Sequence, residues 1–322
     1  MTYFRRLLAM LVLTSVTLTA AQAQAVNSGT IRIIVPSPPG SSSDLGARLI
    51  GEKLQHVLGQ PVVVDNKPGA DGILAAQAAA QAPADGRTLF MGTTTTHVAN
   101  AVLRRKLPYD PVRDFAPVTM TATTALVLLV NSALPVNTVA ELVAYAKANP
   151  GKLSVASGYV SARMAAEMFN QAAGIDLLQV PYKGATAAMT DVVGGQVQVM
   201  FGDLWGAQAF LKSGKLRALA VTTPQRTLTA PNVPTMAESG MPGYEMIAWG
   251  AFFVRAGTPA PVIARLNAEL VAIIGSPEVR QRMLDAGSEV KPGTPQALGK
   301  MIVDDIAKWR RLAEVAHLEI SD

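Results

Sequence analysis

The chain has 322 residues, 28 lysines and arginines against 23 aspartates and glutamates, and no cysteine. The lack of cysteine excludes disulfides, thiolate metal sites, a cysteine nucleophile and a lipid anchor on an N-terminal cysteine. Arg5 and Arg6 belong to a leader segment, so the rest carries 28 − 2 = 26 basic residues and a net charge of 26 − 23 = +3. This balance, with no block of lysine or arginine, argues against nucleic acid as a partner and weakly favours an anionic small molecule.

Residues 1–25 have the pattern of a secretory signal peptide. Arg5 and Arg6 form a positive region, residues 7–19 are apolar, and Ala21-Gln22-Ala23-Gln24-Ala25 offers two overlapping cleavage sites. The apolar region is too short to span a membrane, and no later segment reaches about 18 uncharged apolar residues. We therefore expect a soluble exported protein, without a lipid anchor, in a bacterial periplasm.

A strand, a turn of small residues and a helix are predicted from Ile31 to Leu58. Residues 31–35 are apolar and mostly β-branched, and the prolines at 36, 38 and 39 stop the strand. Ser41 to Asp44 supply N-cap candidates for a helix over 45–58. Such a turn presents backbone N–H groups at a helix N-terminus and suits an anion, but the pattern fits an ordinary capped turn equally well.

Strands and helices then alternate. Strands are expected at 61–66 and 88–92, an alanine-rich helix lies between them at 73–82, and a polar loop follows at 93–97. This alternation predicts a mainly parallel sheet, whose ligands lie outside the carboxyl ends of the strands. The loops at 36–44 and 92–97 both follow strands, so we expect that they can lie side by side.

A second series of strands and helices follows an irregular, proline-rich stretch at 107–117. A long strand at 118–130 leaves the first lobe, and helices are then expected at 138–148, 162–173, 185–193 and 207–211, with strands at 153–156, 177–180, 196–201 and 216–222. The segment 126–242 therefore predicts a second α/β lobe inserted into the chain.

The C-terminal part is expected to return to the first lobe. A strand at 244–254 precedes helices at 261–275, 277–286 and 294–315. We predict a first α/β domain of residues 26–125 and 243–322, and a second of residues 126–242. The two crossing strands then form a hinge with a cleft between the lobes.

Short sequence motifs that are spread over nearly the whole mature chain match a known family. They are Ile31-Arg32-Ile33-Ile34-Val35-Pro36 with Pro38-Pro39-Gly40 and Asp44, Gly59-Gln60-Pro61-Val62-Val63-Val64, Asp85-Gly86-Arg87-Thr88-Leu89, Leu107-Pro108-Tyr109-Asp110-Pro111, Pro181-Tyr182-Lys183-Gly184, Gly194-Gly195-Gln196-Val197, the segment 214–222, Pro231-Asn232-Val233-Pro234-Thr235 and Ala256-Gly257-Thr258-Pro259. With them the chain resembles the periplasmic solute-binding proteins of tripartite tricarboxylate transporters, the Bug (TctC-like) family.

The resemblance implies a two-lobed periplasmic-binding-protein fold, type II-like, that closes like a Venus flytrap. It also implies capture of a small di-, tri- or aromatic carboxylate and its delivery to the membrane subunits of such a transporter, with no cofactor. The family's carboxylate site is built from the loop after the first strand and a facing loop of the second domain, partly through ordered water.

The chain departs from the family pattern near that site. Ser37 and Ser41 stand where many members have Phe and Gly-Gly, and Asp71 stands where many have glycine. The loop at 156–163 is shorter than usual and carries Arg163 near the expected histidine. Arg163 either indicates a different ligand or is a solvated residue at a helix start.

Fourteen residues are the candidates for ligand contacts, and each has a structural alternative such as a helix cap. They are Ser37, Gly40, Ser41, Ser42, Ser43 and Asp44 in the first loop, Thr93 and Thr94 after the third strand, Ser157, Gly158, Tyr159, Ser161 and Arg163 in the second lobe, and Asp203 at a later strand end. A carboxylate at 203 suits an amine, a hydroxyl or a bound water.

A hydrolase and a ligand sensor are the alternatives to a transport receptor. Ser42, His97 and Asp203 offer a hydrolase grouping on paper, but no G-x-S-x-G, H-E-x-x-H or P-loop motif occurs. We therefore predict that the protein is not an enzyme and holds no metal. A ligand sensor acting on a membrane signalling partner, such as a sensor kinase, cannot be separated from a transport receptor by sequence.

Overall fold

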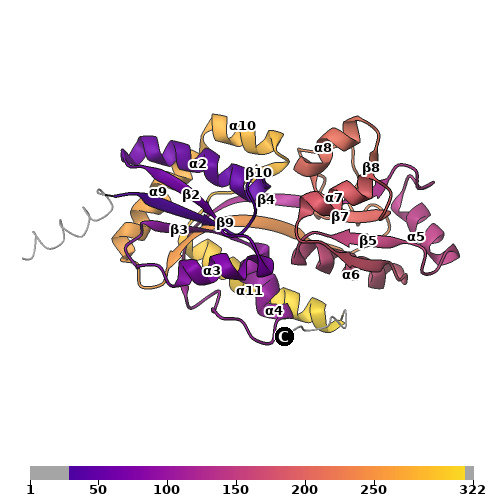
Figure 1. Ribbon diagram of the computed structural model, residues 1–322, viewed down its shortest axis with the longest axis horizontal. Helices are drawn as coiled ribbons and strands as arrows, with labels where there is room; N and C mark the ends of the chain where they lie inside the picture. Colours follow the sequence, from indigo (N-terminus) through magenta and orange to yellow (C-terminus); the bar gives the residue numbers. More distant parts are fainter. Residues whose placement is uncertain (1–28, 316–322) are drawn as a thin grey trace, which may run out of the picture.

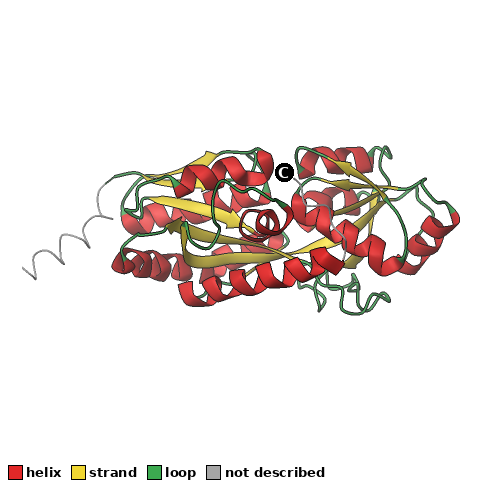
Figure 2. Ribbon diagram, turned by 90° about the horizontal axis from the view of Figure 1, so that it is seen from below, coloured by secondary structure: helices red, strands yellow, loops and turns green. Residues whose placement is uncertain are grey.

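The computed structural model describes residues 29–315, so the predicted signal peptide lies outside the described residues. Two α/β lobes lie side by side along the long axis of the molecule, one with α2 and α9, the other with α5 to α8 (Figure 1). Figure 2 shows helices on both sides of the strands in each lobe. Within residues 29–315, no helix is long and apolar enough to cross a membrane.

The first lobe is built on a mixed sheet in the order β2-β1-β3-β9-β4, with β10 on the far side of β4. β1 pairs in parallel with β2 and β3, as the alternation of strands and helices predicted, while β9 runs antiparallel to β3 and β4. The strands are β1 (Ile31–Val35), β2 (Val62–Asn66), β3 (Thr88–Thr93), β4 (Phe115–Asn131), β9 (Ile247–Arg255) and β10 (Ser288–Val290).

Helices from both ends of the chain cover this sheet. They are α2 (Ser42–Leu58), the short turns η1 (Ala70–Gly72) and η2 (Thr95–Ala99), α3 (Ile73–Ala80), α4 (Asn100–Leu103), α9 (Ala260–Gly275), α10 (Pro277–Asp285) and α11 (Pro295–Val315). α9 packs on α2 and β4, and α11 packs on β4 and η2, so the C-terminal helices return to the first lobe as predicted.

The second lobe has the strand order β8-β4-β7-β5-β6, in which β5 is parallel to β6 and β7. Its strands and helices are β5 (Ser154–Ser157), β6 (Leu178–Pro181), β7 (Val199–Asp203), β8 (Leu216–Val221), α5 (Val139–Ala148), α6 (Val160–Ala173), α7 (Ala185–Val193) and α8 (Leu204–Lys212). The βα series of the first lobe is thus repeated, as the sequence predicted.

β4 belongs to both sheets. Its partners change between Ala125, which pairs with Ile247 of β9, and Leu126, which pairs with Asp203 of β7. Residues 125–131 of β4 are all buried, so the strand enters the second lobe through its core. The division into domains at 125/126 and 242/243 stays a prediction.

The second crossing is formed by loop ends held against β4 rather than by a second full-length strand. β9 pairs with β4 only up to Ala125, and residues 222–246 connect β8 to β9. The buried Thr222 fastens this connection: its N–H donates to the Leu126 carbonyl (2.9 Å), and its hydroxyl accepts from the Leu126 N–H (3.1 Å). Met246 N–H donates to the Thr222 carbonyl (2.9 Å), which closes the crossing.

The apolar core also continues between the lobes. Phe90 and Trp249 of the first lobe and Phe201 of the second belong to one cluster of buried side chains. The Tyr244 ring stacks on Phe201, and its hydroxyl donates to the Ala165 carbonyl of α6. The two lobes are therefore connected by this buried cluster as well as by β4 and the Thr222 crossing.

We expect Thr222→Val to destabilise the protein by about 1–3 kcal/mol, because it keeps the shape but leaves a buried N–H and a buried carbonyl without the hydroxyl. Urea unfolding measures this. Thr190→Val is the control, since that exposed hydroxyl bonds only to its own helix at the Thr186 carbonyl (2.9 Å). Equal losses in both variants would contradict the role given to Thr222.

Candidate functional site

The loops after β1 and β3 meet, as expected from their parallel strands. Gly72 marks the meeting point, since a Cβ there would lie 2.7 Å from Thr96 Cγ2 and 2.9 Å from Pro36 Cβ. Its φ of +79° is in the left-handed region, so glycine is required twice, by conformation and by space. The loops at 36–44 and 92–97 therefore lie side by side at the carboxyl edge of the sheet.

Asp44 is buried and binds its own loop. Its carboxylate accepts from the Gly40 N–H (2.8 Å), the Asn66 amide (2.9 Å) and the Arg48 guanidinium (3.0 Å). Burial acts to raise the pKa of Asp44, but these hydrogen bonds and the positive charge of Arg48 outweigh it, so the pKa lies below the ordinary value. Asp44 and the Gly40 N–H thus shape the loop and are already engaged.

The serines of this loop differ in what they bind. The Ser41 hydroxyl accepts from the Asp44 N–H (3.3 Å) and caps α2, which explains why the helix begins earlier than predicted. Among residues 29–315, the hydroxyls of Ser37, Ser42 and Ser43 have no hydrogen-bond partner. Ser42 is exposed and Ser37 and Ser43 are half-buried, so these three hydroxyls are the ones available to a ligand.

The threonines after β3 are engaged within the protein. The buried Thr94 hydroxyl accepts from the Trp249 N–H of β9 (2.8 Å), and the half-buried Thr93 hydroxyl accepts from the Thr96 N–H (3.4 Å). These bonds favour the structural alternative for Thr94, while the position of Thr93 at the strand end leaves one lone pair and its proton free for a ligand.

His97 is fully buried among aromatic rings and carries no site chemistry. Its ring stacks on Phe253 (3.8 Å between centroids), and its Nδ1 lies 3.0 Å from the Thr96 hydroxyl. Burial lowers the pKa of His97 to about 3, so the ring is neutral at ordinary pH. Within the described chain, Nε2 has no partner, so neither Ser42 nor Asp203 is bonded to it and the hydrolase grouping is not assembled.

Gly158 allows close packing in the second lobe. A Cβ at Gly158 would lie 2.5 Å from the Ala185 Cα, so the loop after β5 touches the start of α7 and only glycine fits. The Ser157 hydroxyl beside it is buried and donates to the Gln179 side chain (3.1 Å). Ser157 and Gly158 therefore hold the loop in place.

The start of α6 offers free donors. Tyr159 is the N-cap residue, and its side chain does not cap the helix. Ser161 in the first turn is buried, and its hydroxyl has no hydrogen-bond partner within residues 29–315. Backbone N–H groups at a helix start and a free hydroxyl together suit a negatively charged group.

Asp203 lies at the end of β7, and no cationic side chain balances its charge within residues 29–315. Its Oδ1 accepts from the Gly206 N–H (2.9 Å) and caps α8. Burial raises the pKa of Asp203, and only backbone N–H groups oppose this. Burial also raises the pKa of Tyr159 well above its ordinary value, and the charge of Asp203 adds to the effect.

Arg163 lies one turn further along α6. It is half-buried and near Glu167, whose pKa is raised by burial and by Asp176 and lowered by the Arg163 charge. Arg163 is therefore partly balanced by a carboxylate of its own helix. The structure fits either of the two interpretations of this residue.

Elements of the two lobes are in contact in two places. α6 of the second lobe packs against η2, the turn that follows β3 in the first lobe. The Gln208 amide of α8 donates to the Asp285 carbonyl of α10 (3.1 Å), and a Cβ at Gly287 would lie 3.0 Å from Leu204 Cβ. Loops of both lobes thus meet, although the roles of the fourteen candidates remain predictions.

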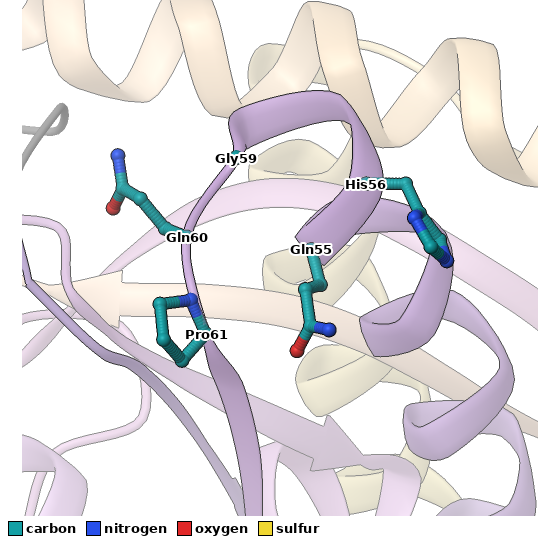
Figure 3. Close-up of a pocket in the computed structure, with 5 residues that line it drawn as sticks. All are labelled: Gln55, His56, Gly59, Gln60 and Pro61. Atoms are coloured by element: carbon teal, nitrogen blue, oxygen red, sulfur yellow. The ribbon is translucent and has the colours of Figure 1, made fainter.

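A surface hollow lies away from these loops. It has a volume of about 410 Å³ and is lined by Gln55, His56, Gly59, Gln60 and Pro61. It lies at the C-terminal end of α2, and Figure 3 shows His56 and Gln60 pointing away from each other. At about 1.5 Å per residue, the 17-residue helix places it about 25 Å from the serine loop. No group of three metal-ligating side chains occurs in the described part of the chain.

Two α/β lobes that share a long strand, with strand-end loops facing each other at the crossing, define a periplasmic solute-binding protein. The family model of the tripartite tricarboxylate transporter family receptor, TctC, matches residues 46–318. The chain belongs to this family, as its sequence motifs indicated.

Known relatives cover nearly the whole chain. An R. palustris protein solved with adipate is 34% identical, with a TM-score of 0.86 over 89% of this chain and 97% of that one. MatC from Rhodopseudomonas palustris, solved with malate, is 32% identical, with a TM-score of 0.82 over 88% and 98%. Protein BugT of Bordetella pertussis is 34% identical over 282 residues, 87% of this chain and 86% of its own length.

We expect Asp44→Asn to destabilise the protein by about 1.5–3 kcal/mol at pH 7, because it weakens hydrogen bonds to a buried charge. The pKa of Asp44 is lowered in the folded state, so its contribution is complete above the ordinary carboxyl value of 3.8 and is lost as the pH falls through the folded value. Urea unfolding from pH 7 to pH 3 should show the difference shrinking. The control is Asp304→Asn, whose exposed pair with Lys300 contributes little.

Asp203→Asn should act in the opposite direction. The pKa of Asp203 is raised by burial, so the wild type loses stability as the pH rises from 3.8 through the folded value, whereas asparagine still caps α8 and carries no charge. We expect the variant to match the wild type near pH 3.5 and to be more stable at pH 7 in thermal unfolding. A variant less stable at pH 7 would show that the charge is compensated.

Proposed function

We propose that this receptor captures a small di-, tri- or aromatic carboxylate between its lobes and delivers it to the membrane subunits of a tripartite tricarboxylate transporter. The observation that carries the proposal is that η2, which lies beside the loop after β1, packs against α6 of the second lobe. Adipate and malate in two similar proteins support a carboxylate as the ligand. Export to the periplasm, through removal of residues 1–25, is part of the proposal.

Neutral donors do most of the binding. The free hydroxyls of Ser37, Ser42 and Ser43 form the first half of the site, and Ser161 with the N–H groups that open α6 forms the second half. Hydrogen bonds to a charged acceptor contribute about 1.5–3 kcal/mol each. Two such groups therefore suffice to hold a carboxylate once closure has removed water.

Closure is a consequence of where these donors lie. A ligand held by one lobe alone leaves half of its acceptors in water, whereas a closed cleft satisfies them and favours the closed state. β4 and the Thr222 crossing are the points where the backbone can turn. The closed form then presents one surface to the membrane partner, and no covalent chemistry is required.

Asp203 and Arg163 select further groups of the ligand, beyond its first carboxylate. A half-buried carboxylate that accepts only from backbone N–H groups favours a ligand that brings a hydroxyl or an ammonium group to it. Arg163 is the cationic candidate for a second carboxylate, because it is half-buried and lies one turn beyond the N-cap residue Tyr159 of α6. A hydroxylated dicarboxylate satisfies both conditions.

A thermal-shift screen of the mature protein tests the proposal. Malate, adipate, citrate and benzoate are compared with lysine, glucose and choline at equal ionic strength. A ligand present at 100 times its dissociation constant stabilises the folded state by about 2.7 kcal/mol. We expect a shift with at least one carboxylate; no shift with any carboxylate, or a shift only with a neutral or cationic solute, contradicts the proposal.

Serine variants locate the site. We expect Ser43→Ala to weaken binding of that carboxylate about tenfold, which corresponds to about 1.4 kcal/mol, in isothermal titration calorimetry. Ser213→Ala at the end of α8 is the control, because its exposed hydroxyl bonds only to the Phe210 carbonyl (3.2 Å). Equal affinities for Ser43→Ala, Ser42→Ala and the wild type would exclude the serine loop.

A further inference from the structure

A second hollow, of about 480 Å³, lies between the segment 101–113 and the outer face of α11. It includes the proline-rich stretch whose sequence pattern had no assigned role, and it is formed by the first lobe alone. We call it the arginine hollow, because Arg104, Arg105, Arg113 and Arg310 all line it.

The charge of the arginine hollow is strongly positive for its size. Four arginines and one acidic residue, Asp110, give a net charge of 4 − 1 = +3. Arg113 pairs with Asp110 (2.8 Å) and Arg104 with Asp71 (2.6 Å). Arg105 and Arg310 are exposed and have no acidic partner within residues 29–315, so they are free to bind an anion.

The floor of the hollow is rigid. The Tyr109 hydroxyl donates to the Thr96 carbonyl of η2 (2.6 Å), and the Asp110 carboxylate accepts from the N–H groups of Val112 (2.9 Å) and Arg113 (2.8 Å). Burial acts to raise the pKa of Asp110, but these hydrogen bonds lower it overall, so Asp110 stays ionised. A floor held in this way loses little conformational entropy when a partner binds.

Apolar side chains stand beside the arginines. Val112 is 47% exposed and Val303 of α11 is 51% exposed, and both are among the large apolar residues that the surface leaves uncovered. Arginine is enriched in protein interfaces and among the residues that contribute most of their affinity, and exposed apolar side chains beside it add surface that a partner can cover. Because exposed residues form its walls, the hollow is too open to enclose a small ligand.

We propose that the arginine hollow docks an acidic, apolar-tipped segment of a protein partner. One large apolar side chain of the segment covers Val112 and Val303, and carboxylates on either side pair with Arg105 and Arg310. The hollow is lined by four arginines and by no lysine. Guanidinium groups bind carboxylates in bidentate geometry, so this lining favours carboxylates as partners. A protruding segment fits a concave surface, whereas a flat bilayer surface does not reach its floor.

Matched charge variants test the proposal. The probe is a fluorescein-labelled 12-residue peptide with a central Leu-Trp pair flanked by three Asp or Glu residues on each side, and binding is measured by anisotropy at 50 mM salt. Arg105→Glu/Arg310→Glu should weaken binding at least tenfold. Lys106→Glu/Arg311→Glu, the same charge change on exposed neighbours outside the hollow, should change it less than threefold.

Further arms separate the alternatives. Val303→Asp, or replacement of Leu-Trp by Ala-Ala in the peptide, should also weaken binding at least tenfold if the apolar contact is real. Absence of peptide binding, or equal losses in the two double variants, overturns the proposal. Binding to phosphatidylglycerol vesicles that is lost only in Arg105→Glu/Arg310→Glu, with no peptide binding, assigns the hollow to lipid and also overturns it. Unchanged carboxylate binding in these variants shows that they fold.

Discussion

One strand, β4, holds the two lobes together and limits how they can move. Its buried half pairs with β7 and β8, its other half pairs with β9 and β10, and the partners change at Ala125 and Leu126. Thr222 fastens the returning chain to the same point. Because both crossings meet there, this is the place where the backbone turns in the closure proposed above.

Two aspartates near the starts of helices differ in what holds their charge. The Asp44 carboxylate in the first turn of α2 pairs with Arg48 and accepts from Asn66 and the Gly40 N–H, whereas Asp203, the N-cap of α8, accepts only from backbone N–H groups. Asp44 therefore shapes its own loop. The role of Asp203 as a ligand contact stays a prediction.

The local patterns of the sequence predicted most of the fold, since strand and helix periodicity and caps such as Ser41 act over a few residues. Whether a candidate side chain is free or already bonded within the protein depended instead on residues far away in the sequence. Thr94 bonds to Trp249, 155 positions away, and His97 is enclosed by Phe253. The short strand β10 was also missed, because three residues carry no detectable period and form a strand through pairing with the distant β4.

A crystal structure with the carboxylate that gives the largest thermal shift tests capture between the lobes. We expect one carboxylate group within hydrogen-bond distance of the serine loop at 37–43 and of the first turn of α6, with the lobes closed about β4. A ligand bound to one lobe only, or in the hollow beside Gln60, would contradict it.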